Sequence, residues 1–411
     1  MPEFLELLPP KLALDLFLSH LPSAHLEGEV IPTQDALGRV TISDIRSPEL
    51  LPAFARSTVD GYAVRAVDTY GAGESQPGYL VLVGEIPMGA SSTISLKLGE
   101  AALIHTGGML PKGADAVIML EYTQPVDERE IEIIKPVAKG ENIIEPGEDV
   151  QIGQVVIPAG KQLHSADLGG LSALGITNVI VRRKPRVAVL SSGDEVIPPL
   201  QTPQPGQVRD VNSTTLSALI SRAGGLPICY DIVPDRQEDL ERILVNALAD
   251  CDAAVITAGS SASTRDYTAA AISKMGEPGV LVHGVNVKPG KPTILAVCND
   301  KPVVGLPGNP VSALVIAWLF VEPLIRHMLG SSSLPVLPSI RARLTANVPS
   351  LAGREDYVPV RIKSDDHQLI AEPIFFKSNL IFSLAQSDGL ICIPADATGF
   401  SAGTVVEVFS I

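Results

Sequence analysis

Two lysines flank a Pro-Gly turn in the segment Val287-Lys288-Pro289-Gly290-Lys291-Pro292. The prolines and the glycine fix the spacing of these lysines and keep them out of a helix. The chain has a formal net charge of −15, so an anionic substrate would need a locally basic site against the overall field. We therefore expect Lys288 and Lys291 to bind an oxyanion or a phosphate. A solvated basic turn is the alternative.

A predicted helix start follows this turn at Gly305-Leu306-Pro307-Gly308-Asn309-Pro310. Asn309 is a good N-cap, and Pro310 is a good first helical residue. An ordinary helix start would account for both residues, but it would not account for the additional Pro307-Gly308. Because the amide groups of a helix N-terminus attract anions, we expect Pro307, Asn309 and Pro310 to contribute to the same site.

Two polar loops follow short apolar runs. The first, Ser191-Ser192-Gly193-Asp194-Glu195, offers hydroxyls and two carboxylates. The second follows Ala253–Thr257 and is built of small residues, which let backbone N–H groups approach a phosphate. Its candidate ligand-binding residues are Gly259, Ser260, Ser261 and Ser263, with Asp266 just beyond them. An ordinary strand–turn–helix connection is the alternative for this second loop.

Weaker signals lie in the first half of the chain. Asp60-Gly61 places a carboxylate beside a glycine, and His105-Thr106-Gly107-Gly108 places a hydroxyl at the end of a predicted strand. Each motif alone is typical of a simple turn.

The elements that must position these residues differ along the chain. From about Pro185, predicted strands alternate with predicted helices, which indicates an α/β domain with a parallel sheet and helices on both faces. The strands are Arg186–Leu190, Pro227–Val233, Ala253–Thr257 and Pro302–Gly305, and the helices are Asn212–Ala223, Asp235–Leu248 and Pro310–Met328. Ligands bind at the carboxyl ends of such strands. Short β-like runs predict a mostly β N-terminal half, and alternating patterns after Gly330 predict a small β-barrel or sandwich.

The composition excludes several classes of partner. An acidic chain is a poor ligand for nucleic acid or for an anionic membrane. The longest apolar run, Val311–Val321, is shorter than the roughly 20 residues that span a bilayer. The N-terminus carries Glu3 and Glu6 where a secretory signal would be basic, and the four cysteines form no C-x-x-C pair. We therefore expect a cytoplasmic protein with no nucleic-acid or membrane partner.

Taken together, these segments resemble the molybdopterin molybdenumtransferase family, which includes the bacterial MoeA proteins and the gephyrin E-domain. The matching segments are collinear and cover about residues 35–325. In chain order they are Asp60-Gly61-Tyr62-Ala63, Thr106-Gly107, Gly113-Ala114-Asp115, Gly147-Glu148-Asp149, Ser192-Gly193-Asp194-Glu195, Asp266-Tyr267, Lys288-Pro289-Gly290-Lys291-Pro292 and Leu306-Pro307-Gly308-Asn309-Pro310-Val311-Ser312.

The resemblance implies four domains. Residues 1–45 and 145–182 would form an elongated linker and dimerisation domain, and residues 46–144 a β-rich domain carrying Asp60 and Thr106. Residues 183–328 would form a MogA-like α/β domain that binds molybdopterin, and residues 329–411 a C-terminal β domain. The resemblance also implies a homodimer with its active site at the subunit interface.

The implied reaction inserts molybdate into adenylylated molybdopterin, releases AMP and requires a divalent cation, usually magnesium. Molybdopterin adenylyltransferase would donate the substrate. The family's functional acids match Asp60, Glu195 and Asp266, which are also the candidate magnesium ligands. Its functional threonine matches Thr106, its two lysines match Lys288 and Lys291, and its structural prolines match Pro307 and Pro310. Arg354 and Ser378 are further candidates for an oxyanion contact.

The chain departs from the family pattern in three places. Gly259 to Arg265 replaces a Gly-Gly-Val-Ser-Val-Gly run, Ser57-Thr58-Val59 replaces Ser-Ala-Met, and Gly108-Met109 replaces Ala-Pro. A divergent paralogue that binds molybdopterin without inserting molybdenum, or that handles tungstate, is therefore an alternative. A scaffold protein on the same fold is another. The preceding, adenylylating enzyme of the pathway is a third, although it lacks the motifs around Asp60 and Thr106.

Overall fold

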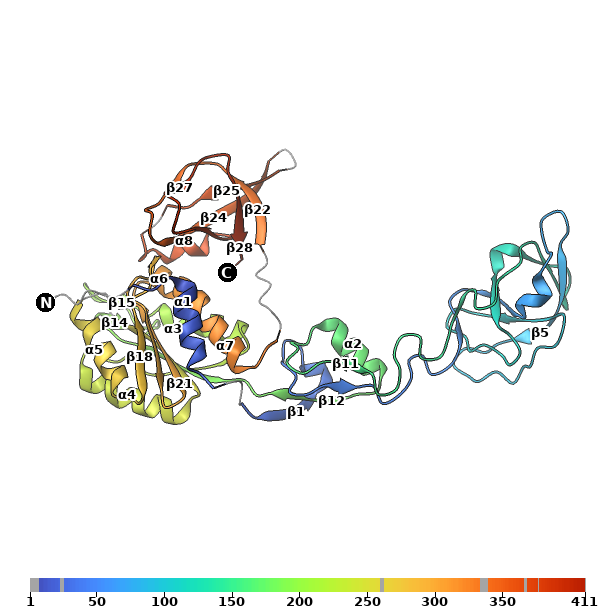
Figure 1. The fold of residues 1–411 in the computed structure, drawn as a ribbon, viewed down its shortest axis with the longest axis horizontal. Coiled ribbons are helices and arrows are strands. Elements are labelled where there is room, and N and C mark those ends of the chain that lie inside the picture. The colour runs from blue at the N-terminus through green and yellow to red at the C-terminus, as the bar shows by residue number, and fades with distance from the viewer. Residues whose placement is uncertain are drawn as a thin grey trace.

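The computed structural model describes residues 7–22, 26–258, 262–332, 339–365, 368–375 and 377–410, and only the backbone of residues 262–266. Figure 1 shows an elongated subunit. An α/β domain carries a C-terminal β domain on one side, and a narrow arm leads away from it to a β-rich domain at the far end.

The α/β domain is built on a six-stranded sheet. Its order is β16 (Leu226–Cys229), β13 (Arg186–Ser191), β17 (Ala253–Ala258), β21 (Lys301–Pro307), β20 (Ile294–Cys298) and β18 (Pro278–His283). The first four strands are parallel, and they confirm the predicted strands of this domain. The predicted parallel sheet is thus confirmed for these four strands, and the sheet is extended by β20 and β18, which are antiparallel to their neighbours. Asn299 and Asp300 join β20 to β21 with positive φ angles of 50° and 66°, and such a two-residue turn reverses the chain.

Helices cover both faces of this sheet. One face carries α1 (Pro10–Ser19), α3 (Asn212–Arg222), α6 (Pro310–Ile316), the π-helical turn η4 (Ala317–Val321) and α7 (Glu322–Met328). The other carries α4 (Gln237–Asp250) and α5 (Ala262–Ser273). Along β13, Val187 and Val189 face the first layer, whereas Ala188 and Leu190 face the second. Successive side chains of a strand point to opposite faces, so an unbroken apolar run is what a doubly covered strand requires.

The continuous helix Pro310–Met328 is long and apolar enough to cross a membrane by length and composition. Its 19 residues include a window of mean hydropathy 1.5, but 67% of that window is buried inside the fold. The helix thus has the burial of a core helix of the α/β domain.

The arm is formed by chain segments on either side of the distal domain. Strand β1 (Gly28–Pro32) pairs with β12 (Asn178–Arg182), and β2 (Ile45–Arg46) pairs with β11 (Val155–Ile157). Helices η1 (Thr33–Asp35) and α2 (Ser165–Ala173) pack against them.

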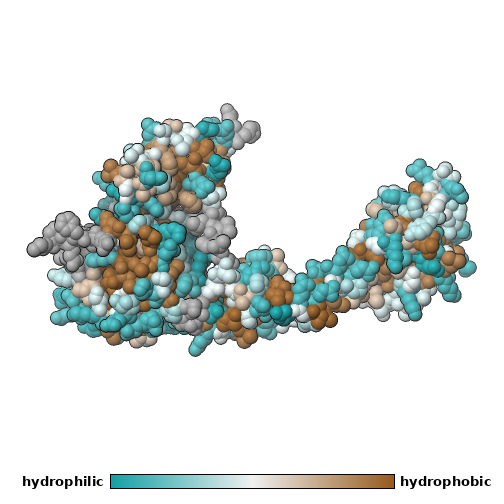
Figure 2. Space-filling model, in the orientation of Figure 1, coloured by the Kyte–Doolittle hydropathy of each residue, from teal (hydrophilic) through white to brown (hydrophobic). Residues whose placement is uncertain are grey.

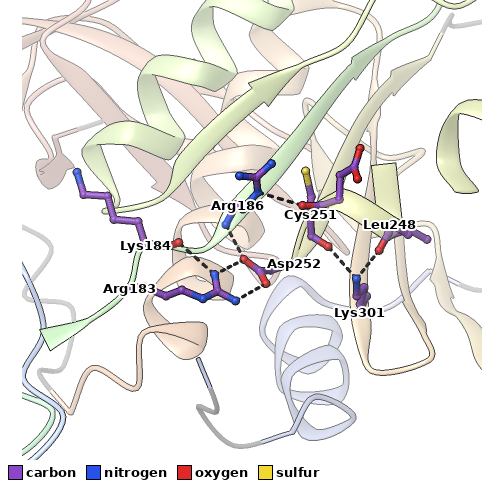
Figure 3. A network of polar contacts seen from close by, with 8 residues as sticks. Arg183, Lys184, Arg186, Leu248, Cys251, Asp252 and Lys301 are labelled. Carbon is purple, nitrogen blue, oxygen red and sulfur yellow. Dashed lines mark hydrogen bonds and ion pairs between the residues drawn. The ribbon is translucent and has the colours of Figure 1, made fainter. Parts of the chain in front are cut away.

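An ion pair fixes the point where the arm enters the α/β domain, as Figure 3 shows. Arg183 donates to both carboxylate oxygens of Asp252, at 2.7 and 2.8 Å, and the backbone N–H of Arg186 donates to the same carboxylate. Lys301 donates to the carbonyls of Leu248 and Cys251 beside it. Since Arg186 begins β13, this network lies at the end of the sheet opposite the carboxyl ends of its parallel strands.

The distal domain contains a second six-stranded sheet, which confirms the predicted β character of this half. Its order is β7 (Ala116–Met119), β4 (Gly61–Val64), β6 (Glu100–Ile104), β5 (Gly78–Glu85), β9 (Glu130–Ile133) and β8 (Thr123–Pro125). Strand β3 (Arg56–Ser57) pairs with β10 (Ile143–Ile144), and the short helices are η2 (Ala66–Thr69) and η3 (Leu120–Tyr122).

The C-terminal domain is a closed barrel, one of the two architectures predicted for it. Strands β24 (Glu355–Asp365), β25 (Gln368–Pro373), β22 (Ser339–Leu344), β28 (Val405–Phe409) and β26 (Gly389–Ile393) pair in this order, and β26 pairs back to β24. The domain also contains α8 (Ile381–Ala385) and the pair β23 (Val348–Pro349) and β27 (Gly399–Phe400). Strand β19 (Val287–Lys288) comes from the α/β part of the chain, yet it pairs with β24 at the edge of this barrel.

Candidate functional site

A cleft of about 660 Å³ lies between the α/β sheet and the barrel. Its sheet side includes Ala258 and Pro307, the last residues of β17 and β21. Its barrel side includes Arg354, Asp356 and Ser378. The cleft is thus at the carboxyl ends of parallel strands, where α/β sheets bind ligands.

The lysine turn forms one wall of this cleft. Lys288 and Lys291 are exposed and both line it, as do the residues between them. Gly290 has a φ of +114°, and a Cβ at this position would lie 2.3 Å from Cγ1 of the buried Ile316. Both observations require glycine, because L-residues avoid this φ and a methyl group does not fit the available space. The sequence therefore places the turn rigidly against α6.

The barrel holds the same turn from its other side. Lys288 pairs in register with Asp356 across the parallel strands β19 and β24, and its Nζ lies 3.7 Å from that carboxylate. Asn286 donates to the carbonyl of Gly353, and the N–H of Glu355 donates to the carbonyl of Asn286. The turn is thus tied to a chain segment more than sixty residues later in the sequence.

The helix start at Pro310 lies where the sequence predicted it, and the barrel contributes to its hydrogen bonds. Asn309 occupies the N-cap position, but its side chain makes no capping hydrogen bond. Its Nδ2 instead donates to Oγ of Ser378 at 3.1 Å, and the N–H of Val311 donates to the carbonyl of Ser378 at 3.1 Å. The predicted N-cap position of Asn309 is confirmed, and the barrel supplies hydrogen-bond partners for its Nδ2 and for the N–H of Val311. Pro307, Asn309 and Ser378 nevertheless line the cleft together.

A buried asparagine explains how the Pro307-Gly308 loop is held. Asn212 is 9% exposed, and its Nδ2 donates to the carbonyl of Gly308 at 2.8 Å. Asn212 begins α3, so this bond links two helix starts at the same edge of the sheet. Just before α3, the carboxylate of Asp210 accepts from the N–H of Ser213 at 3.0 Å.

Glu195 lies beyond the carboxyl end of β13, in an exposed turn. A buried polar network supports this edge of the sheet: Ser191 lies 3.0 Å from Oγ of Ser213, which donates to Asp210 at 2.6 Å. Glu195 itself is not among the described residues that line the cleft. The structure therefore brings Glu195 to the same edge of the sheet as the lysine turn, but not into the same cavity.

The predicted phosphate loop falls largely outside the described residues. Gly259, Ser260 and Ser261 are not described, and Ser263 and Asp266 are described only as backbone within α5. The flanking residues Ala258 and Thr268 both line the cleft. The roles of the five loop residues stay predictions.

Asp60 and Thr106 meet in the distal domain. The backbone N–H and the hydroxyl of Thr106 donate to Oδ1 of Asp60 at 2.7 and 3.1 Å. These two hydrogen bonds, with a smaller contribution from His105, lower the pKa of the Asp60 carboxyl below its ordinary value. A Cβ at Gly61 would lie 1.9 Å from the carbonyl oxygen of Ile118, so glycine is required beside Asp60. The result is an exposed, ionised carboxylate held in one orientation.

Within one subunit, Asp60 and the cleft lie at opposite ends, because β4 and β6 belong to the distal domain (Figure 1). Among the described side chains, no three histidine, cysteine, aspartate or glutamate residues gather as a metal site. The predicted magnesium ligands Asp60, Glu195 and Asp266 thus stay a prediction. Their oxygen donors are of the kind that magnesium prefers.

Three family models match the chain. They are the MoeA N-terminal region (domain I and II) over residues 8–175, a probable molybdopterin binding domain over residues 188–327, and the MoeA C-terminal region (domain IV) over residues 341–411.

Relatives and solved structures agree with these matches. The chain is 32% identical over 390 residues to the molybdopterin molybdenumtransferase of a Nostoc species, covering 93% of this chain and 88% of that protein. It is 31% identical over 389 residues to the enzyme of the same name from Bacillus subtilis, with 94% and 90% covered. A crystal structure of the molybdopterin biosynthesis MoeA protein of Pyrococcus horikoshii matches with a TM-score of 0.86 at 32% identity, covering 99% of this chain and all of that one. The chain therefore belongs to the MoeA family, as the motifs in its sequence predicted.

Proposed function

We propose that this protein is a molybdopterin molybdenumtransferase, which inserts molybdate into the dithiolene of adenylylated molybdopterin and releases AMP. The observation that carries the proposal is the cleft. Lys288, Lys291 and Arg354 all line it, although the protein as a whole is acidic. The curated relatives named above carry this activity in their names.

The cleft offers three kinds of group to an oxyanion. The two lysines and Arg354 can donate charge-assisted hydrogen bonds, which are the strong ones. Ser378 accepts from Nδ2 of Asn309, so its own hydroxyl proton is free to point to a ligand. We assign oxyanion binding to these four side chains. Pro307 and Pro310 keep the neighbouring backbone rigid.

The remaining predicted residues would act on the other end of the substrate. We assign Gly259, Ser260, Ser261 and Ser263 to the phosphate of the pterin. Asp60, Glu195 and Asp266 would hold magnesium, which would neutralise charge on the phosphoanhydride when bound. Thr106 keeps the Asp60 carboxylate ionised and oriented, as its two hydrogen bonds indicate. The dithiolene sulfurs of the substrate would be the ligands of molybdenum, because soft thiolates suit it and this chain has no cluster of cysteines among its described residues.

We propose that the active form is a homodimer in which the distal domain of one subunit reaches the cleft of the other. The length of the arm supports this arrangement, since it separates Asp60 from the cleft of its own subunit (Figure 1). An apolar surface supports it as well. Figure 2 shows a brown area on the α/β domain below the barrel, and a groove of about 380 Å³ between α3, α6 and α8 is lined by Leu219, Leu314 and Trp318. Exposed apolar patches of this kind often mark protein interfaces.

The direct test is to incubate the pure protein with adenylylated molybdopterin, magnesium and either molybdate or tungstate. Release of AMP together with incorporation of the metal is the expected result, and omission of the oxyanion is the control. Binding of the pterin with no AMP release would favour the paralogue alternative. The same assay identifies the preferred oxyanion, and addition of a molybdopterin adenylyltransferase tests whether that enzyme donates the substrate. We place this reaction in the cytoplasm, as the sequence suggests.

Mixed dimers test the shared active site. Asp60→Asn and Lys291→Ala should each abolish metal insertion alone, because every site then lacks one group. After the two inactive variants are mixed and allowed to exchange subunits, a heterodimer has one site with both groups intact, and activity should return to about a quarter of the wild-type value on simple mixing statistics. No recovery despite proven subunit exchange would refute an active site shared between subunits.

A further inference from the structure

The barrel places one carboxylate among the cations of the cleft. Asp356 is 2% exposed and lies at the second position of β24. It accepts from Nε of Arg354 at 2.7 Å and from Nη2 of the same side chain at 3.3 Å, and it faces Nζ of Lys288 at 3.7 Å. A buried carboxylate needs such partners, because an unpaired charge is costly away from water.

These contacts leave donors of both cations free for a ligand. Arg354 has five N–H donors in a planar fork and Lys288 has three, so each keeps several after serving Asp356. Their side chains are 29% and 59% exposed, whereas that of Asp356 is 3% exposed. The carboxylate therefore lies behind the two cations, and the cations face the cleft.

The charge of the cleft suits a tetrahedral dianion. Among the described residues that line it, Lys288, Lys291 and Arg354 are cationic and Asp356 is the one carboxylate, which gives a net charge of +2. Without Asp356 the same side chains would carry a larger positive charge but would have no common anchor. Long cationic side chains then lose conformational entropy on binding, which weakens the complex.

We propose that Asp356 is a positioning residue: it fixes Arg354 and Lys288, from two different domains, at the spacing that an oxyanion requires. This inference rests on the proposed function, because it concerns the same site. It also gives the barrel a role, since β24 carries Asp356 and pairs with the strand that carries Lys288.

The direction in which Asp356→Asn changes the molybdate affinity distinguishes a positioning role from a purely electrostatic one. Asp356→Asn removes a negative charge from the cleft, so electrostatics alone predicts tighter binding of an anion. Positioning predicts weaker binding, by at least about tenfold, because one or two charge-assisted hydrogen bonds lose their geometry. The affinity of the intact protein for molybdate, measured by isothermal titration calorimetry at fixed ionic strength, decides between them. Sulfate has the same shape and charge but is smaller, and the variant should discriminate less between the two oxyanions.

Glu355→Gln is the matched control. It removes the same charge one residue away, but Glu355 accepts from the hydroxyl of Tyr357 and does not line the cleft. Its molybdate affinity should be unchanged or slightly higher. Arg354→Lys keeps the charge and loses the planar fork, so it should also weaken binding by at least about tenfold. Because Asp356 acts through Arg354, adding Asp356→Asn to the Arg354→Lys variant should weaken molybdate binding by less than about a further threefold.

The outcomes are distinct. A wild-type protein that binds neither oxyanion refutes the proposed function and this inference with it. Wild-type binding together with unchanged or tighter binding by Asp356→Asn refutes the inference alone. If Asp356→Asn does not fold, Arg354→Lys decides: retained affinity in that variant overturns the assigned positioning, and a tenfold loss supports it.

Discussion

The tight contact between the lysine turn and α6 predicts a large coupling between Gly290 and Ile316. Gly290→Ala places a methyl group 2.3 Å from Cγ1 and 2.4 Å from Cδ1 of Ile316, at a φ of +114°. The backbone strain costs about 1–3 kcal/mol, and the overpacking costs about 1–3 kcal/mol more. We expect a loss of roughly 2–6 kcal/mol in the free energy of unfolding. The affinity for molybdate should fall as well, because the lysines move with the turn.

Ile316→Ala separates the two contributions. It removes both atoms that the new methyl group would meet, and alone it should cost about 2–5 kcal/mol because it leaves a cavity in the core. In the double variant the methyl group occupies part of that cavity, so only the backbone strain of Gly290→Ala remains. The double variant should therefore be more stable than the sum of the single effects predicts, by about 1–3 kcal/mol.

The single tryptophan makes this measurement specific. Trp318 is 7% exposed and contacts the rings of Tyr357 and Phe409, so its fluorescence reports on the junction of the α/β domain and the barrel. Denaturant unfolding of the wild type, the two single variants and the double variant, followed by Trp318 fluorescence, gives the double-mutant cycle. Additivity within about 0.5 kcal/mol would refute the argument that the contact with Ile316 excludes a side chain at position 290.

Two further predictions concern hydrogen bonds at the site. Asn309→Ala removes the donor to Ser378, so molybdate affinity should fall about threefold to tenfold while the unfolding free energy changes by about 1 kcal/mol. Calorimetry measures the affinity and denaturant unfolding measures the stability. An unchanged affinity would show that Asn309 does not need to orient the Ser378 hydroxyl. In the folded protein the pKa of the Asp60 carboxyl should lie below its usual value of about 3.9. The stability that its ionised form contributes is therefore fully present above the unfolded-state pKa, and it is lost as the pH falls through the folded-state pKa. Thr106→Val should raise this pKa only in part, because the backbone N–H of residue 106 still donates, and an NMR titration of the Asp60 carboxyl that shows no shift would contradict the assignment.

Local sequence patterns were sufficient for much of the fold. The apolar run of β13 predicted a strand covered on both faces, and the Asn309-Pro310 pair located the start of α6 to the residue. The antiparallel strands were missed, although their signals are present. Only ten residues separate His283 from Ile294, too few for the usual crossover between parallel strands, and Asn299-Asp300 is a two-residue turn of hairpin type.

The site was predictable in its parts but not in its pairings. Lys288, Arg354 and Ser378 were identified from sequence, and the structure places them around one cleft. Asp356 was missed, because its burial against Arg354 and Lys288 depends on the pairing of β24 with β19, and a pairing between segments so far apart leaves no local pattern. The hydrogen bond from Asn309 to Ser378 was not predictable for the same reason, since it joins the α/β domain to the barrel.

The pairing of β2 with β11 has a consequence for how the molecule is assembled. Arg46 lies opposite Val155, so the chain leaves the arm and returns to it at neighbouring positions after folding the whole distal sheet. That sheet is thus an insertion with adjacent ends, and the arm is itself inserted between α1 and β13. A short loop joining residues 46 and 155 should leave both strands of the arm in place. The distal domain could therefore be exchanged between relatives as a unit. One end of the molecule can then diverge in sequence while the α/β domain and the barrel keep their packing.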